Sequence, residues 1–273
     1  MDLQLSGRRA LLLGAGRGLG GAAAVSLARE RASVALVART RSAVEERARL
    51  CREAGAPDAL AITADATDPA QLERAVREAA TGLGGLDVLV TLVGGSQPGG
   101  AEMDDAAWAA AFDRNLWPAI RATRLALPFL EASAKERGAL APPSVVAPGS
   151  RQQSVVLHVA SIWGREGGGS MGYNAAKAAL ISLAHEEARE LAPRGVRVLS
   201  LAPGSILHPG GSWERRLRSD PKAIAEFVRR EIPFGRFGTA EEVGDCITFL
   251  CSPRASWIAG ACVVVDGAQS RSF

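Results

Sequence analysis

The sequence predicts an α/β fold built on a doubly wound, parallel sheet of seven strands. Two observations lead to this prediction: seven short segments are almost wholly aliphatic, and amphipathic stretches of helix length lie between consecutive segments. A parallel strand that helices cover on both faces is apolar at nearly every position. The connection to the next parallel strand also needs such a helix, so the two observations support one architecture.

The elements follow in order along the chain. The strands are expected at residues 8–13, 33–38, 59–64, 86–93, 154–160, 196–202 and 262–266. Helix starts are marked by Asp68-Pro69, by Asp220-Pro221 and by a capping box from Thr239 to Glu242. No change in composition separates a second domain, so residues 1–273 are expected to form one. Within this domain, residues 137–153 are predicted to form a Pro- and Ala-rich loop. Residues 204–232 are predicted to lie beside the substrate.

Composition excludes several classes of function. The chain is 47% hydrophobic and 22% charged, and its formal net charge is +3 without long runs of one sign. Neither nucleic acid nor a membrane is therefore expected as a partner. The first residues lack a basic segment followed by a long apolar one, which predicts a cytoplasmic protein. The cysteines and histidines show no spacing typical of metal ligands, so no metal is expected.

A glycine-rich turn, GAGRGLG at residues 14–20, follows the first predicted strand and precedes a helix. Gly14, Gly18 and Gly20 permit a tight turn and let backbone N–H groups approach a pyrophosphate. The dipole at the start of the helix favours the same anion. The pattern predicts a dinucleotide site, and a plain tight turn is the alternative.

Tyr173 and Lys177 form a second pattern. Tyr173 is the only tyrosine of the chain, and Lys177 is one of three lysines. Residues four apart on a helix share a face, so the two side chains can converge on one point. An ammonium group beside a phenol lowers the pKa of the phenol, which predicts a proton donor. A surface pair without function is the alternative.

Together with further motifs, these patterns resemble the short-chain dehydrogenase/reductase family. The motifs are DATD at 65–68, FDRNL at 112–116, VASIWG at 159–164, YNAAK at 173–177, LAPGSI at 201–206, and GRFGTAEEVGDCITFL through VVVDGA at 235–268. The resemblance covers essentially the whole chain, and it extends to family members that are similar to 3-oxoacyl-carrier-protein reductases. It implies a Rossmann fold, oxidoreductase activity on a ketone or secondary alcohol, and the catalytic residues Asn115, Ser161, Tyr173 and Lys177.

The resemblance also implies a role for each of these residues. Tyr173 would protonate the carbonyl oxygen as hydride arrives from nicotinamide, and Ser161 would donate a hydrogen bond to that oxygen. Lys177 would hold the nicotinamide ribose, and Asn115 would support a water that resupplies the proton. The implied cofactor-binding residues are Gly14, Arg17, Gly18, Leu19, Gly20, Arg39, Asp65, Gly94, Tyr173, Lys177, Pro203, Gly204 and Ile206. For Asp65, an Asx turn is the alternative to a contact with adenine.

The end of the second predicted strand bears on coenzyme choice. An acidic residue there would bind the ribose 2′-hydroxyl of NAD, and none is present. Arg39 follows Ala38 instead, and Arg17 lies within the glycine turn. These two guanidinium groups could bind the 2′-phosphate of NADP(H). We therefore predict NADP(H) as the cofactor. Solvent-facing arginines without this role are the alternative.

The loops that follow the fourth, fifth and sixth strands should shape the substrate pocket. Trp163, Met171 and Trp213 are expected to line it, although each would equally suit the edge of a core. A cluster of arginines in the last loop could meet a carboxylate or phosphate, or could form a solvated helix face. Its members are Arg215, Arg216 and Arg218.

Two positions depart from the family pattern. Leu13 stands before the first glycine, where relatives usually carry Thr, and Thr91-Leu92-Val93-Gly94 stands where relatives carry Asn-Asn-Ala-Gly. Those polar residues normally link neighbouring strand ends below the cofactor. We therefore expect apolar packing to replace the polar link.

The helix that begins at Tyr173, YNAAKAALISLA, is apolar or small on nearly every face, so a partner should cover it. With the resemblance, this predicts a homotetramer in which this helix and the preceding long one form the dimer seam. Two other functions stay open: a cofactor-binding regulator without turnover, and a scaffold protein that uses the Pro-rich loop. Reduction of a carbon–carbon double bond is disfavoured, because enoyl reductases of the superfamily have a wider Tyr-to-Lys spacing.

Overall fold

Seven parallel strands form the central sheet of the computed structural model, which describes residues 1–139 and 152–272. Their order across the sheet is β3-β2-β1-β4-β5-β6-β9. The strands are β1 (Arg9–Leu13), β2 (Ser33–Ala38), β3 (Ala59–Thr63), β4 (Val88–Thr91), β5 (Ser154–Val159), β6 (Val196–Pro203) and β9 (Cys262–Val265). The predicted fold class is confirmed, and every predicted strand is present. Residues 140–151 of the predicted Pro-rich loop lie outside the described residues.

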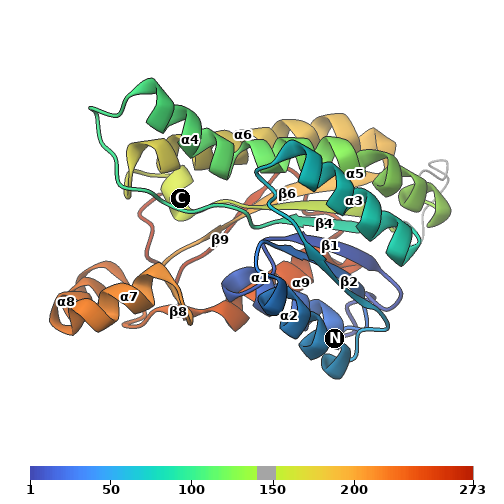
Figure 1. Ribbon diagram of the computed structural model, residues 1–273, viewed down its shortest axis with the longest axis horizontal. Coiled ribbons are helices and arrows are strands. Elements are labelled where there is room, and N and C mark those ends of the chain that lie inside the picture. Colours follow the sequence, from blue (N-terminus) through green and yellow to red (C-terminus); the bar gives the residue numbers. More distant parts are fainter. Residues whose placement is uncertain (140–151, 273) are drawn as a thin grey trace.

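Helices cover both faces of the sheet (Figure 1). On one face lie α1 (Gly18–Arg29), α2 (Arg41–Ala54) and α9 (Ala240–Cys251), and on the other lie α3 (Pro69–Leu83), α5 (Trp117–Glu136) and α6 (Met171–Leu191). Alternate residues of a strand point to opposite faces, so β1 sends Leu12 into one apolar core and Leu11 and Leu13 into the other. Within the described residues, no helix is long and apolar enough to cross a membrane.

The predicted helix starts are confirmed by their caps. The carboxylate of Asp68 accepts hydrogen bonds from the backbone N–H groups of Ala70 and Gln71 at the start of α3. Asp220 caps α8 (Pro221–Glu231) in the same way, and Thr239 forms a capping box with Glu242 on α9. Each cap satisfies N–H groups that the first turn of a helix leaves without partners.

The strand order reverses beside β1, which lies between β2 and β4. Helices therefore leave β1 and β4 toward opposite faces, and a crevice opens at the carboxyl ends of these strands. The elements near this edge are α4 (Asp105–Asn115), the short helix η1 (Ile162–Gly164), the strand pair β7 (Ile206–Leu207) and β8 (Gly238–Thr239), α7 (Ser212–Ser219) and α8. In Figure 1, α7 and α8 extend from the sheet as a separate pair, within the segment 204–232 that the sequence places beside the substrate.

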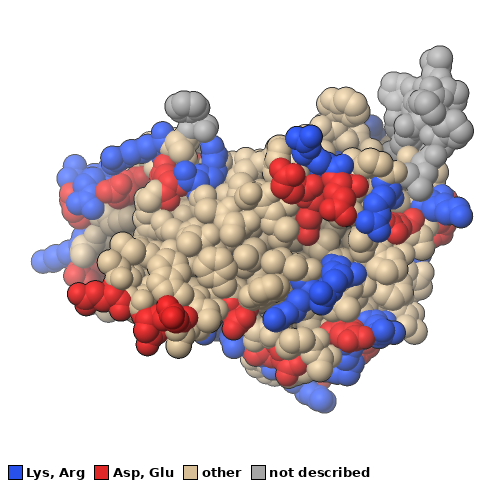
Figure 2. All heavy atoms as spheres, turned by 90° about the horizontal axis from the view of Figure 1, so that it is seen from above, with Lys and Arg blue, Asp and Glu red and all other residues tan. Residues whose placement is uncertain are grey.

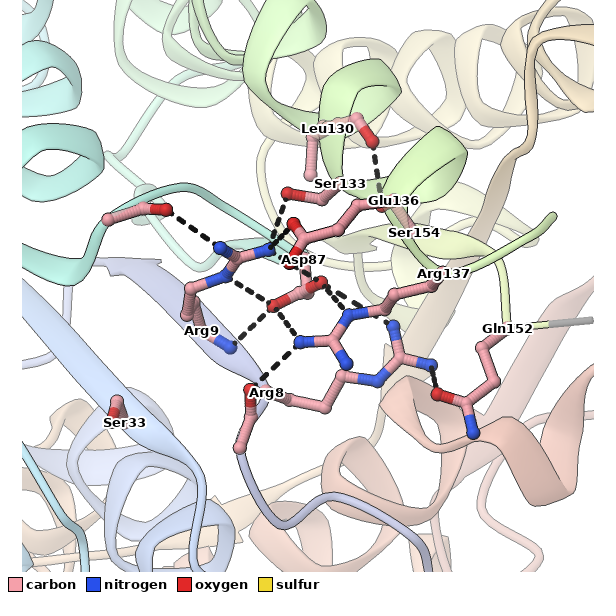
Figure 3. Close-up of polar contacts among 12 residues, drawn as sticks. Arg8, Arg9, Ser33, Asp87, Leu130, Ser133, Glu136, Arg137, Gln152 and Ser154 are labelled. Atoms are coloured by element: carbon pink, nitrogen blue, oxygen red, sulfur yellow. Dashed lines mark hydrogen bonds and ion pairs between the residues drawn. The ribbon is translucent and has the colours of Figure 1, made fainter.

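At the amino ends of the strands, a buried carboxylate holds three arginines together (Figure 3). Asp87, just before β4, has no exposed surface and accepts hydrogen bonds from the guanidinium groups of Arg9 and Arg137. The Arg8 guanidinium lies 3.7 Å from the same carboxylate. Asp87 lies inside the segment predicted as a strand, whereas β4 begins one residue later, at Val88.

Candidate active site

Tyr173 and Lys177 lie on the first turns of α6. Lys177 is 3% exposed, and its ammonium donates a hydrogen bond of 2.9 Å to the carbonyl of Val159, the last residue of β5. The Lys177 Nζ atom lies 5.7 Å from the centre of the Tyr173 ring. The carboxyl end of a central strand therefore fixes the ammonium beside the phenol.

Ser161 reaches the same point from the end of β5. It precedes η1, and its hydroxyl accepts a hydrogen bond of 3.2 Å from the backbone N–H of Trp163. Ser161 and Tyr173 line the same cavity, and the Ser161 hydroxyl acts to lower the pKa of the phenol. The edge of the Trp163 ring system also packs against Tyr173, with 6.5 Å between ring centres. These contacts hold the phenol at the carboxyl end of β5.

Burial raises the pKa of Tyr173, and the neighbouring Ser161 hydroxyl offsets only part of that effect. This corrects the prediction that the neighbouring ammonium lowers the pKa of the phenol. Burial also lowers the pKa of Lys177 to about 8, and its ammonium is bonded to the carbonyl of Val159. The phenol therefore keeps its proton at neutral pH, which is the state that a general acid needs.

Asn115, the last residue of α4, is brought to the same place. Its side chain is 3% exposed and bridges two segments: Nδ2 donates to the carbonyl of Ala111 at 2.9 Å, and Oδ1 accepts from the N–H of Gly95 at 2.8 Å. A Cβ atom at Gly94 would lie 2.7 Å from Asn115 Oδ1 and 3.1 Å from Lys177 Nζ. Only glycine fits there, and the same glycine lines a cavity together with Ser161 and Tyr173.

Two connected cavities open beside these residues. The inner cavity, of about 290 Å³, is lined by Ser161 and Tyr173 together with Pro203, Gly204 and Ile206. The outer cavity, of about 940 Å³, reaches the glycine turn and α7. Both cavities share Leu19, Gly94, Trp163, His208 and Trp213 on their walls. The phenol thus faces a space that continues to the predicted dinucleotide site.

A third cavity, of about 600 Å³, lies at the end of β2. Its walls include Arg17, Arg39 and Asp65, all predicted from the sequence. The Asp65 carboxylate accepts hydrogen bonds from the N–H and hydroxyl of Thr67, which is the Asx turn considered as an alternative. Burial acts to raise the pKa of Asp65, but the bonds from Thr67 and the nearby Arg39 guanidinium hold it below its usual value. Asp65 therefore both forms the turn and lines the cavity.

The glycine turn fits a dinucleotide. A Cβ atom at Gly20 would lie 2.4 Å from the carbonyl oxygen of Gly14, and one at Gly16 would lie 2.9 Å from Ala38 Cβ. Backbone thus approaches backbone where a pyrophosphate could meet the first N–H groups of α1. The outer and third cavities both contain Gly14, Arg17 and Gly94, so one elongated molecule could follow the sheet edge from β2 to Tyr173.

The structure corrects one expectation about the departures from the family pattern. Leu13 is fully buried, as apolar packing requires, but Thr91 retains a polar link. Its hydroxyl lies 2.8 Å from Nδ1 of the buried His158, whose Nε2 lies 2.8 Å from Glu187 on α6. A polar connection from β4 through β5 to α6 therefore supports this part of the sheet, because a buried imidazole needs partners for both nitrogens.

Two residues differ from the predicted pocket. Met171, the first residue of α6, is 50% exposed and lies outside the walls of the three cavities. His208 was not predicted, yet it lines the inner and outer cavities, and a Cβ atom at Gly18 would lie 2.8 Å from its ring. Its place two residues before the Gly210-Gly211 turn was the available signal.

Comparison with known proteins agrees with this geometry. A family model described as Enoyl-(Acyl carrier protein) reductase matches residues 14–268. The chain is 30% identical to 2-(S)-hydroxypropyl-CoM dehydrogenase 3 of Xanthobacter autotrophicus over 272 residues, which are 99% of each protein. The chain belongs to the short-chain dehydrogenase/reductase family.

Solved structures of short-chain dehydrogenase/reductases share the fold over the full chain. L-sorbose reductase from Gluconobacter frateurii, in complex with NADPH and L-sorbose, superimposes with a TM-score of 0.87 at 26% identity, covering 100% of both chains. A 7α-hydroxysteroid dehydrogenase, in complex with NADH and 7-oxo glycochenodeoxycholic acid, gives a TM-score of 0.85 at 26% identity, covering 99% of this chain and 97% of the other. These similarities place the chain among NAD(P)-dependent oxidoreductases.

Proposed function

We propose that this protein is an NADP(H)-dependent reductase of a ketone, or the dehydrogenase of the corresponding secondary alcohol. The observation that carries the proposal is the placement of Tyr173 and Ser161 on the wall of one cavity, with the buried Lys177 beside the phenol and the glycine turn on the adjoining cavity. The names of the relatives support the reaction class, since they are dehydrogenases of alcohols and a reductase of a ketose.

When bound in this site, NADPH would supply the hydride that reduces the carbonyl carbon. Ser161 donates a hydrogen bond to the carbonyl oxygen, and Tyr173 gives its proton to that oxygen as negative charge develops there. The Lys177 ammonium stabilises the phenolate that remains. Asn115 holds the backbone at Gly95, beside Gly94, where the nicotinamide end of the site would lie.

Coenzyme preference follows from the arginines of the third cavity. We expect NADPH to be preferred over NADH by at least about tenfold in kcat/KM, because charge-assisted hydrogen bonds from Arg39 and Arg17 would hold the 2′-phosphate. Arg39→Asp should reverse the preference. The matched control is Arg41→Asp, since Arg41 is exposed and outside this cavity. Equal use of both coenzymes by the native enzyme would contradict the assignment.

Turnover separates this proposal from a cofactor-binding regulator or a scaffold. Oxidation of NADPH, followed by loss of its absorbance against a panel of ketones, is expected for the enzyme and not for the other two. Enones in the same panel test reduction of a carbon–carbon double bond, the reaction that the description of the matching family model names. We expect reduction at the carbonyl, because Tyr173 and Lys177 lie four residues apart.

We also propose a homotetramer. Figure 2 shows the face above the α4, α5 and α6 layer, where charged side chains leave a broad uncharged area in the middle. Uncharged exposed residues on these helices include Trp117, Ala178 and Ser182. A second copy packed on α5 and α6 would cover them. Sedimentation at micromolar concentration should give a tetramer, and Ala178→Glu should disrupt it. A native monomer would contradict this proposal.

A further inference from the structure

The outer cavity carries an excess of positive charge. Its wall contains the guanidinium-bearing residues Arg17, Arg215 and Arg216, and none of its wall residues is an aspartate or a glutamate. Arg17 belongs to the glycine turn and also lines the third cavity, so the proposed cofactor accounts for it. Arg215 and Arg216 come from α7, in the segment beside the substrate, and need another explanation.

Within the predicted arginine cluster of α7, the three side chains have different surroundings. Arg218 forms a 3.0 Å ion pair with Glu214 and is absent from the cavity walls described above. Arg215 donates one hydrogen bond of 2.8 Å to the carbonyl of Gly210. Among the described residues, no carboxylate lies within ion-pair distance of Arg215 or Arg216. Two of the three arginines thus offer their charge to the cavity.

An apolar surface adjoins this charge. Trp213 stacks on Phe227 of α8 with 4.6 Å between ring centres, and both line the outer cavity. The guanidinium carbon of Arg216 lies 5.0 Å from the centre of the Trp213 ring. Such stacking orients the planar guanidinium while its N–H groups remain available to an anion. Trp213 also lines the inner cavity, so this surface extends toward Tyr173.

From this arrangement we infer the class of substrate, an inference that rests on the proposed ketone reduction. The substrate is a ketone whose apolar body lies against Trp163, Trp213 and Phe227 and which carries an anionic group, a carboxylate or a sulfonate. Arg215 and Arg216 bind that group, and the carbonyl lies at Tyr173. A planar, two-oxygen edge of such an anion matches the paired N–H donors of a guanidinium.

The test compares substrates that differ only in charge. We would measure kcat/KM with NADPH for 4-oxocyclohexanecarboxylate, for 6-oxoheptanoate and for the methyl ester of each, together with a matched keto-sulfonate. The native enzyme should prefer each acid over its ester by about tenfold or more, as expected for a charge-assisted hydrogen bond. Comparison of the carboxylates with the sulfonate then decides between the two anions.

Substitutions assign the preference to the residues. Arg215→Gln and Arg216→Gln should each lower kcat/KM for the acids by about tenfold and leave the esters and the Kd of NADPH unchanged. Arg218→Gln, on the same helix, is the matched control and should change neither kcat/KM for the acids nor the Kd of NADPH. Esters reduced as well as acids, or Gln variants that weaken NADPH binding instead, would overturn the inference. If NADPH binds and no member of any pair is reduced, the proposed reductase function itself is wrong.

Discussion

Tyr173→Phe is expected to lower kcat by about 100-fold or more, because only the proton donor is removed. The phenyl ring retains the packing against Trp163, and Ser161, Lys177 and the cavity walls are unchanged. Binding of NADPH and the unfolding midpoint should therefore stay close to those of the native protein. Single-turnover kinetics with a ketone substrate measures the loss of rate, and fluorescence titration measures the binding of NADPH.

The chain allows a direct check, since Tyr173 is its only tyrosine. Tyrosinate absorption during a pH titration, with Tyr173→Phe as the blank, reports the pKa of this one phenol. Because burial raises that pKa in the protein alone, the transition should lie above the value of about 10 for a free phenol. A variant that keeps more than about a tenth of the native kcat, or a transition below 10, would show that the acid is misassigned or its surroundings misread.

The fold was predictable because its signals are local. Aliphatic runs, helix caps and a glycine turn are readable in a few consecutive residues, and the sheet that they imply is present. The two-residue pair β7 and β8 was missed, because so short a strand has no periodicity to detect. The strand predicted at residues 86–93 spans only Val88–Thr91, because hydropathy does not mark where strand pairing ends. Hydropathy also cannot show that the Asp87 carboxylate meets three arginines from distant segments.

The site was predictable only in part, because some of its contacts join residues that are far apart in the sequence. Spacing within α6 placed Tyr173 beside Lys177. The direction in which the pKa of the phenol shifts depends on burial, which the neighbouring residues in the sequence do not reveal. The link from Thr91 to His158 joins residues 67 apart in sequence, so no motif contained it. His208 likewise reaches the cavities only through packing of the segment after β6. The pair of Arg218 with Glu214, by contrast, joins residues four apart on one helix and was within reach of a sequence prediction.

Asp87→Asn is expected to destabilise the protein by about 3–5 kcal/mol, the usual cost of leaving buried charges without their partner. Arg9 Nε donates to Asp87 at 2.8 Å and Arg137 Nη2 donates at 3.0 Å (Figure 3). Arg8 is 2% exposed, and burial lowers its pKa to about 10 despite the attraction of Asp87. The amide would leave these guanidinium groups facing one another. Urea denaturation at neutral pH measures the loss of unfolding free energy.

A matched control is available in the same cluster. Glu136 also pairs with Arg9, at 3.1 Å, but its side chain is 65% exposed. Glu136→Gln should therefore cost no more than about 1 kcal/mol, because solvent screens the pair. If Asp87→Asn and Glu136→Gln destabilise the protein equally, the buried carboxylate does not hold the three arginines in the way we infer.

The stabilisation by Asp87 is also expected to depend on pH. Burial acts to raise the pKa of Asp87, but hydrogen bonds from Arg137 and Arg9 outweigh it and hold the pKa below its ordinary value. A carboxylate whose pKa is lower in the folded protein stabilises the fold fully above its unfolded pKa of about 4. That contribution is lost as pH falls through the lower, folded value. The difference in unfolding free energy between the native protein and Asp87→Asn should therefore be constant from neutral pH to about 5 and shrink below about 4. A difference that stays constant in acid would show that the stabilisation does not come from the ionised carboxylate.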